Sequence, residues 1–251
     1  MHIVSIHAHP DDAEILGGGT LALLAAAGHA ITIVTMTPGD KGSDEIGPEE
    51  IAAIRRVEAM TAAALIGADY RCAEFRDLEI FPDHASRRTV VELTRQLRPD
   101  IVLTAAPSDY LADHEITSAL VRDALFAAAA PNYRTATAAL PSIPHLYFMD
   151  PIEGLDREGR RVAPGFIVDV TPVFETKRAM LAAHASQRAW LMRRHGIDDY
   201  LRAMEAWCAE RGREAGVRYG EGFRHYTGHP YPRTPRLEQL LGDAVKSTIG
   251  A

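Results

Sequence analysis

The segment that decides the fold lies near the start of the chain and runs Ile3-Val4-Ser5-Ile6-His7-Ala8-His9-Pro10-Asp11-Asp12-Ala13-Glu14. Its apolar beginning predicts a buried strand. A run of three glycines and the apolar residues 21–27 follow, and they predict a helix that Gly28 ends. Histidines and acids therefore crowd the turn between a first strand and a first helix. In an open parallel sheet this turn lies where such folds bind their ligands.

The same alternation of strand and helix patterns continues to about residue 150. Apolar, β-branched or aromatic runs predict further strands at 30–36, 70–75, 101–104, 144–149 and 166–170. Helices are predicted at 48–66, 86–97 and 115–130. In the helix 48–66 the expected buried face consists of Ile51, Ile54, Val57 and Leu65.

The last third of the chain has a different character. After Thr171 helical patterns run to His195 and again from Asp198 to about Arg211, and the tail from Gly216 is rich in aromatic residues and proline. The predicted fold class is therefore α/β, with a Rossmann-like, mostly parallel sheet flanked by helices and a helical and irregular C-terminal third. We expect a single domain over residues 1–251.

Composition narrows the classes of partner. The chain has 251 residues and a net charge of −7, without the dense basic stripe that nucleic-acid binding needs. No apolar segment is long enough to span a bilayer, and no signal-peptide pattern is present. Cys72 and Cys208 have no metal-ligand spacing and form no disulfide framework. We therefore expect a cytoplasmic protein that acts on a small molecule, without a membrane or nucleic-acid partner.

Two predicted loops carry the residues that favour a metal site. The loop after the first strand and the loop after strand 101–104 supply His9, Asp11, Asp12, Asp109, Asp113 and His114. If these strands are neighbours where the strand order reverses, both loops meet at one edge of the sheet. Two histidines and one carboxylate then form a metal site with open positions, of a kind that suits catalytic zinc.

Asp11 and Asp12 are expected to have different roles. Neighbouring side chains in an extended segment point to opposite faces, so only one of them can bind the ion from a given side. The other can face a bound water as its general base. A simpler alternative is that both carboxylates only cap the first helix. The three glycines lack the dinucleotide-binding spacing, and we expect them to let the first helix pack closely on the sheet.

The segment His9-Pro10-Asp11-Asp12, together with Asp113-His114, resembles the LmbE/PIG-L family of zinc deacetylases. Further matches are Thr37, Gly39, Gly42, Arg55, Glu58-Ala59 and His184-Ala185-Ser186-Gln187. The resemblance implies a zinc-dependent amidohydrolase that removes the acetyl group from an N-acetyl amino sugar or a related linear amide. It also implies a homo-oligomer.

The resemblance implies a role for each matched residue. His9, Asp12 and His114 would bind zinc or another divalent metal, and Asp11 would be the general base that activates a zinc-bound water. Arg55 would lie near the substrate, and Asp113 would orient a metal-binding side chain. His184 is a candidate for the acid that protonates the leaving amine.

One position departs from the family pattern. The family usually has a histidine three residues before the distal ligand, where this chain has Leu111. The residues that could replace it are Tyr110, His184, His225 and His229. Two other functions stay open: a hydratase or lyase acting on a carboxylated small molecule, and a non-catalytic metal-binding protein.

Overall fold

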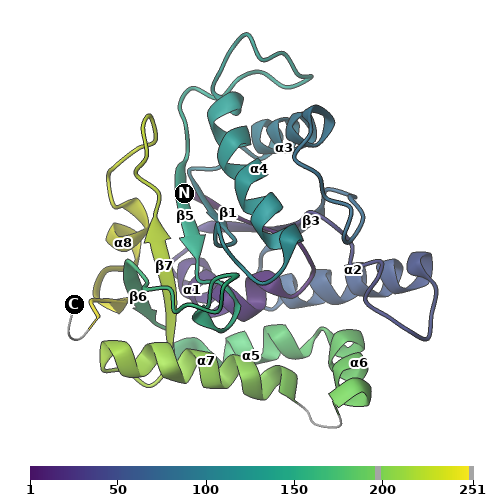
Figure 1. The fold of residues 1–251 in the computed structure, drawn as a ribbon. Coiled ribbons are helices and arrows are strands. Elements are labelled where there is room, and N and C mark those ends of the chain that lie inside the picture. Colours follow the sequence, from purple (N-terminus) through teal and green to yellow (C-terminus); the bar gives the residue numbers. More distant parts are fainter. Residues whose placement is uncertain (196–198, 249–251) are drawn as a thin grey trace.

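The computed structural model of the protein describes residues 1–195 and 199–248. An eight-stranded sheet with the order β3-β2-β1-β4-β5-β7-β6-β8 forms its centre (Figure 1). The strands are β1 (His2–His7), β2 (Ala30–Thr35), β3 (Asp69–Cys72), β4 (Ile101–Thr104), β5 (His145–Met149), β6 (Phe166–Asp169), β7 (Gly220–His225) and β8 (Val245–Lys246). The pairings from β3 to β5 are all parallel, and the chain order reverses between β1 and β4. The predicted α/β class and the position of the reversal are confirmed.

Helices cover both faces of this sheet (Figure 1). The helices are α1 (Asp12–Ala26), α2 (Pro48–Ala64), α3 (His84–Leu97), α4 (Ala112–Ala128), α5 (Phe174–Ala182), α6 (Ala185–His195), α7 (Asp199–Ala215) and α8 (Arg236–Leu241). Three short 3₁₀ helices accompany them: η1 (Ile152–Gly154), η2 (Thr171–Val173) and η3 (Gly242–Ala244). None of the helices in the described ranges has the length and apolar character that crossing a bilayer requires.

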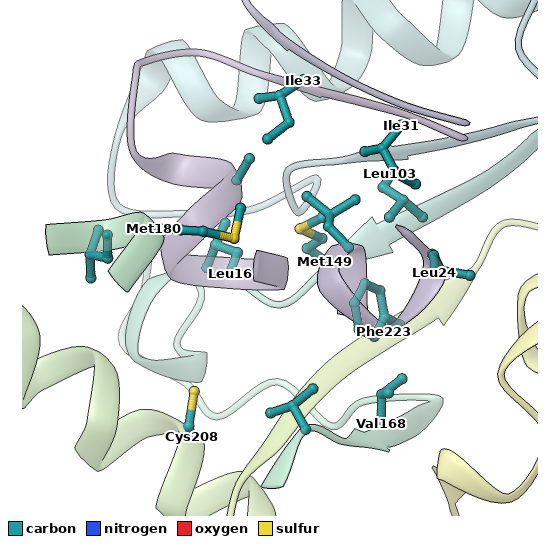
Figure 2. Packing of buried hydrophobic residues seen from close by; sticks show 14 of the residues in the cluster. Leu16, Leu24, Ile31, Ile33, Leu103, Met149, Val168, Met180, Cys208 and Phe223 are labelled. Carbon is teal, nitrogen blue, oxygen red and sulfur yellow. The ribbon is translucent and has the colours of Figure 1, made fainter. Parts of the chain in front are cut away.

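Alternate residues of the central strands enter two separate cores. Ile3 and Leu103 pack into the core shared with α1, α5 and α7. Val4 and Val102, their neighbours in sequence, pack into the core on the α3 and α4 side. This alternation follows from the two-residue period of a strand and buries both faces. Figure 2 shows the first of these cores around Leu16, Met149 and Phe223.

Glycines in α1 permit close packing on the sheet. A Cβ atom on Gly17 would overlap the Met149 side chain, and one on Gly19 would overlap Val170. Helix α1, which begins at the turn after β1, is therefore fixed against β5 and the end of β6. This contact agrees with the predicted packing role of the three glycines.

Two sequence predictions about the fold are wrong in part. The tail is not wholly irregular, because β7 inserts between β5 and β6 and runs antiparallel to both. Of the four residues predicted to form the buried face of α2, only Ile51 is buried; Ile54 and Val57 in the helix and Leu65 at its end are exposed, and alanines and Arg55 complete the buried face. Small residues let α2 approach its neighbours closely, and the buried arginine explains why apolar periodicity predicted the wrong face.

Candidate metal centre and active site

The candidate site forms where β1 and β4 end side by side. The turn after β1 places Asp11 at the N-cap of α1 with φ 105° and ψ −26°, and Asp12 is the first residue of the helix. A positive φ is costly for a residue with a side chain and occurs where the surrounding structure enforces it. The expected extended conformation of this pair is therefore wrong. The left-handed turn at Asp11 gives the two carboxylates their different directions instead.

His114 approaches from the other side of the reversal point. It lies in the first turn of α4, which begins at Ala112 and not at residue 115 as predicted. One ligand atom from each of His9, Asp12 and His114 lies within 4.8 Å of the other two. His114 Nε2 is 3.4 Å from Asp12 Oδ1, and His9 Nδ1 is 3.5 Å from Asp12 Oδ2. Residues that are 105 positions apart in sequence thus converge on one point.

Each imidazole has a second carboxylate at its other nitrogen. Asp113 Oδ2 lies 3.2 Å from His9 Nε2, and Asp109 Oδ1 lies 3.0 Å from His114 Nδ1. A carboxylate at the far nitrogen fixes the ring and makes the near nitrogen a better metal ligand. The donor set of two backed imidazoles and one carboxylate therefore fits a divalent metal ion.

The charges within this cluster depend strongly on one another. Burial disfavours the charged form of His9, but hydrogen bonds with Asp113 and Asp12 raise its pKa to about 9. Burial likewise opposes the ionisation of Asp12, but the charge of His114 holds the pKa of that carboxyl well below its usual value. The cluster therefore stabilises positive charge around the Asp12 carboxylate. A bound cation would supply that charge in place of the protons on the imidazoles.

Asp11 lies in a separate contact set next to the metal-ligand atoms. Tyr200 Oη donates a hydrogen bond to Asp11 Oδ2 at 2.5 Å, and Arg55 Nη2 is 3.6 Å from the same oxygen. Burial raises the pKa of Asp11, although the charge of Arg55 opposes that shift. Asp11 and Asp12, adjacent in sequence, thus have pKa values shifted in opposite directions.

The residues that supported the family resemblance surround Arg55. Its Nη2 donates to Pro10 O at 2.6 Å, and side chains on Gly39 or Gly42 would overlap its guanidinium group. Gln187 Nε2 donates to Gly42 O at 2.9 Å. Arg55 therefore packs against the loop that follows β2 and binds the backbone of the turn between β1 and α1.

A cavity of about 380 Å³ opens beside these groups. Its lining includes His9, Asp11, Asp12, Arg55, His114, Ile15, Lys41, Asp77, Leu78, Tyr110, Leu111, Ile152, Gln187, Trp190, Tyr200 and Trp207. The Lys41 ammonium group donates to Asp77 O and forms an ion pair with Glu79. Asp77 Oδ1 is buried and has no hydrogen-bond partner among the described residues. The wall thus combines polar groups at the metal-ligand cluster with a largely apolar and aromatic remainder.

The candidates to replace the histidine absent at position 111 lie in different places. Tyr110 lines the cavity and meets the His114 ring edge to face, with centroids 5.5 Å apart. His184 is fully buried with Nε2 3.5 Å from Glu14 Oε1, so it lies behind the cavity wall. His225 stacks on Tyr147, and His229 lines a different hollow. Only Tyr110 of these four is a lining residue of the cavity described above.

Sequence reasoning missed two contributions to the site. It placed Asp109 in the correct loop but gave it no role, although its i to i+5 spacing from His114 is compatible with a contact across a helix start. It gave no role to Tyr200, which reaches Asp11 from α7, 189 residues away. No local motif marks this tyrosine, because its role depends on tertiary packing.

Comparison with known sequences supports a family relationship. Residues 4–125 match the family described as PIG-L: GlcNAc-PI de-N-acetylase. A diacetylchitobiose deacetylase of Thermococcus kodakarensis is 27% identical over 242 residues, covering 90% of this chain and 83% of that protein. A 4-oxalmesaconate hydratase of Pseudomonas putida is 29% identical over 193 residues, covering 72% of each. The resemblance noted from the sequence is confirmed.

Solved structures extend the similarity over most of the chain. An N,N'-diacetylchitobiose deacetylase from Pyrococcus horikoshii has a TM-score of 0.76 at 27% identity, covering 93% of this chain and 87% of that one. The 4-carboxy-2-hydroxymuconate hydratase from Pseudomonas putida also has a TM-score of 0.76, at 22% identity, covering 92% and 97%. The fold is therefore shared by proteins named for hydrolysis and for hydration.

Proposed function

We propose, from the match of residues 4–125 to the PIG-L family, that the chain is a metal-dependent deacetylase of N-acetyl amino sugars or related conjugates. The carrying observation is the pair of imidazoles, each backed by its own carboxylate, that converge with Asp12 at the cavity wall. His9, Asp12 and His114 would hold the ion, for which zinc is our proposal. A divalent ion there would supply Lewis acidity towards water and the amide oxygen.

Asp11 is our candidate for the proton transfers. It lines the cavity beside the metal ligands and has a raised pKa, as a group that takes up a proton requires. Water adds to the amide carbon, its proton passes to an Asp11 carboxylate oxygen, and the C–N bond breaks. Because Leu111 cannot donate a proton, Asp11 would return it to the leaving amine. Arg55 and Tyr200 would hold the carboxylate in position during both transfers.

Polar groups of the cavity favour a hydroxyl-rich substrate. Asp77 Oδ1 is a buried acceptor without a partner, which suits a hydroxyl donor better than a carboxylate. The lining cations Lys41 and Arg55 are already bound to protein acceptors. An uncharged sugar therefore meets the needs of these groups without repulsion from the aspartates.

The hydratase relative supports a second candidate, hydration of a carboxylated small molecule. That reaction would need positive charge to bind the substrate carboxylates. The choice between the two can be made by assay, since a hydratase adds water without releasing acetate.

The test measures bound metal and acetate release from N-acetylglucosamine, diacetylchitobiose and glucosaminyl-inositol acetamides. Asp11→Asn is expected to keep the metal and lose about 10²–10⁴-fold in kcat/KM. His114→Ala is expected to lose the metal, while Asp243→Asn, an exposed carboxylate in η3, serves as control. Full activity in Asp11→Asn, or undiminished metal content in His114→Ala, would contradict the assignment.

Assembly and location belong to the same proposal. We expect a cytoplasmic homo-oligomer that acts on a small molecule. Light scattering of the purified protein tests the assembly, and a monomer at micromolar concentration would contradict it.

A further inference from the structure

Leu78 combines two unfavourable features at the mouth of the cavity. Its side chain is 62% exposed, and its backbone has a left-handed φ of 61°. A leucine normally stabilises a protein by leaving water, and a left-handed backbone is easily adopted only by glycine. Both features occur at a residue that lines the cavity.

The backbone of Leu78 explains the left-handed turn but not the side chain. Its N–H donates to Asp113 Oδ2 at 2.7 Å, and the same oxygen contacts His9 Nε2. The turn thus helps to fix the carboxylate that orients a proposed metal ligand. Glycine would supply this N–H with less strain, so the turn alone does not account for the leucine side chain.

Other apolar side chains continue the surface that Leu78 begins. We call this surface the apolar rim; it consists of Leu78, Tyr110, Ile152, Trp190 and Trp207, all of which line the cavity. Tyr110 is 69% exposed although it lies against His114. Tyr110 and Ile152 also line an adjoining hollow of about 410 Å³ that includes Leu155. Tyr110, Ile152 and Leu155 therefore continue the apolar surface beyond the space next to the metal ligands, into a hollow whose other lining residues include Glu153, Asp156 and Arg157.

We propose that the apolar rim binds an apolar aglycone, an alkyl or aryl group attached to the amino sugar whose amide faces the metal ligands. The proposal rests on the deacetylase function for the identity of the sugar. Burying the exposed leucine and tyrosine against such a group would explain their exposure in the free protein. Leu78 would then be a residue that determines specificity, linked through its own N–H to the carboxylate behind His9.

The experiment compares methyl and octyl β-glycosides of N-acetylglucosamine as substrates of the metal-loaded protein. The octyl glycoside is expected to have a kcat/KM about tenfold or more above the methyl glycoside, mainly through a lower KM. Leu78→Gly should remove most of this preference, measured as the ratio of the two kcat/KM values in the same variant. Phe81→Ala is the matched control, since Phe81 is 59% exposed in the same loop and is absent from the cavity lining.

A binding measurement keeps the outcome independent of turnover. Calorimetry with methyl and octyl glucosaminides should show tighter binding and a more negative heat-capacity change for the octyl compound, both reduced in Leu78→Gly. Equal binding of the two compounds would contradict the proposal that the apolar rim binds the aglycone, even if acetate is released from both. Absence of acetate release with octyl-selective binding would instead reject the deacetylase function alone. A changed oligomeric state in Leu78→Gly without a change in selectivity would make the rim a subunit contact and reject the proposal.

Discussion

Two clusters of buried charge lie along α1, and they border cavities of very different size: about 380 Å³ beside His9, Asp12 and His114, and about 40 Å³ beside Glu221. At the first residue of the helix, Asp12 meets His9 and His114 beside open space. Near its middle, Lys177 and Glu221 form an ion pair of 2.5 Å with both side chains almost completely buried. Buried charge by itself therefore does not distinguish a functional site from a structural contact in this protein.

The clusters differ in how their polar atoms are satisfied. Glu221 accepts from the backbone N–H groups of Gly19 and Thr20 and from the Thr20 hydroxyl, and Lys177 donates to Ile15 O. These partners surround the pair with protein donors and acceptors. In the other cluster, three ligand atoms point at one another across a shared point. A cation can bring those atoms together, whereas the Lys177–Glu221 pair is already complete.

The largest expected effect is a loss of stability when the Lys177–Glu221 pair is broken, without a loss of metal binding. Lys177→Met leaves Glu221 buried without its cation, and we expect the free energy of unfolding to fall by about 3–5 kcal/mol. Metal bound per folded molecule should stay unchanged. Chemical denaturation and metal analysis of the folded fraction measure both quantities.

Lys246→Met supplies the control, because that lysine in β8 is partly exposed and, among the described residues, donates to the nearby backbone oxygen of Asp243. If Lys177→Met also lost the metal, α1 would couple the two clusters. The contrast drawn between them would then fail.

A smaller effect is expected when the carboxylate behind one imidazole loses its charge. Asp109→Asn keeps an acceptor near His114 Nδ1 but removes the charge, so we expect metal affinity to weaken about 10–100-fold. Titration of the metal-free protein with zinc gives the dissociation constants.

Asp83→Asn is a charge-matched control, since Asp83 caps α3 and asparagine caps a helix equally well. An unchanged zinc affinity in Asp109→Asn would remove the role assigned to the backing carboxylates. The site would then differ from the Lys177–Glu221 cluster mainly in the size of the cavity beside it.

The parallel half of the fold follows from local sequence. The β-branched strands and the polar turns after them predict the sheet, its reversal point and the convergence of His9 with His114. These features depend on short runs whose pattern survives in the folded chain. The same reasoning places Asp113 near the site, where it contacts His9.

Strand β7 shows why the antiparallel part of the sheet could not be predicted from the sequence. Its residues Gly220, Glu221 and Gly222 have low strand propensity, and each is explained by a distant partner. A side chain on Gly222 would overlap Asp150, and one on Gly220 would overlap Ile167. Glu221 is buried because α1 and Lys177 bind it. Such requirements are set by tertiary contacts and leave no periodic pattern in the sequence.

The smallest expected effect concerns a carboxylate outside both clusters. Glu92 on α3 accepts hydrogen bonds from the N–H and hydroxyl of Thr137, and these bonds lower its pKa to about 2. A depressed pKa contributes stability above the ordinary value near 4.5, and this contribution is lost as the pH falls towards 2. Because Glu92 is partly exposed to solvent, we expect Glu92→Gln to cost less than about 1 kcal/mol at pH 6.

The pH dependence of that cost is the test. The difference in unfolding free energy between Glu92→Gln and the parent protein should shrink between pH 6 and pH 3, as measured by urea denaturation. Gln96→Ala, which removes only a neutral donor to Glu92, is expected to show a weaker dependence on pH. A cost that stays constant over this range would show that the charge of Glu92 contributes nothing. The geometry of its hydrogen bonds would then account for the contribution of Glu92, and charge would matter only at the two clusters along α1.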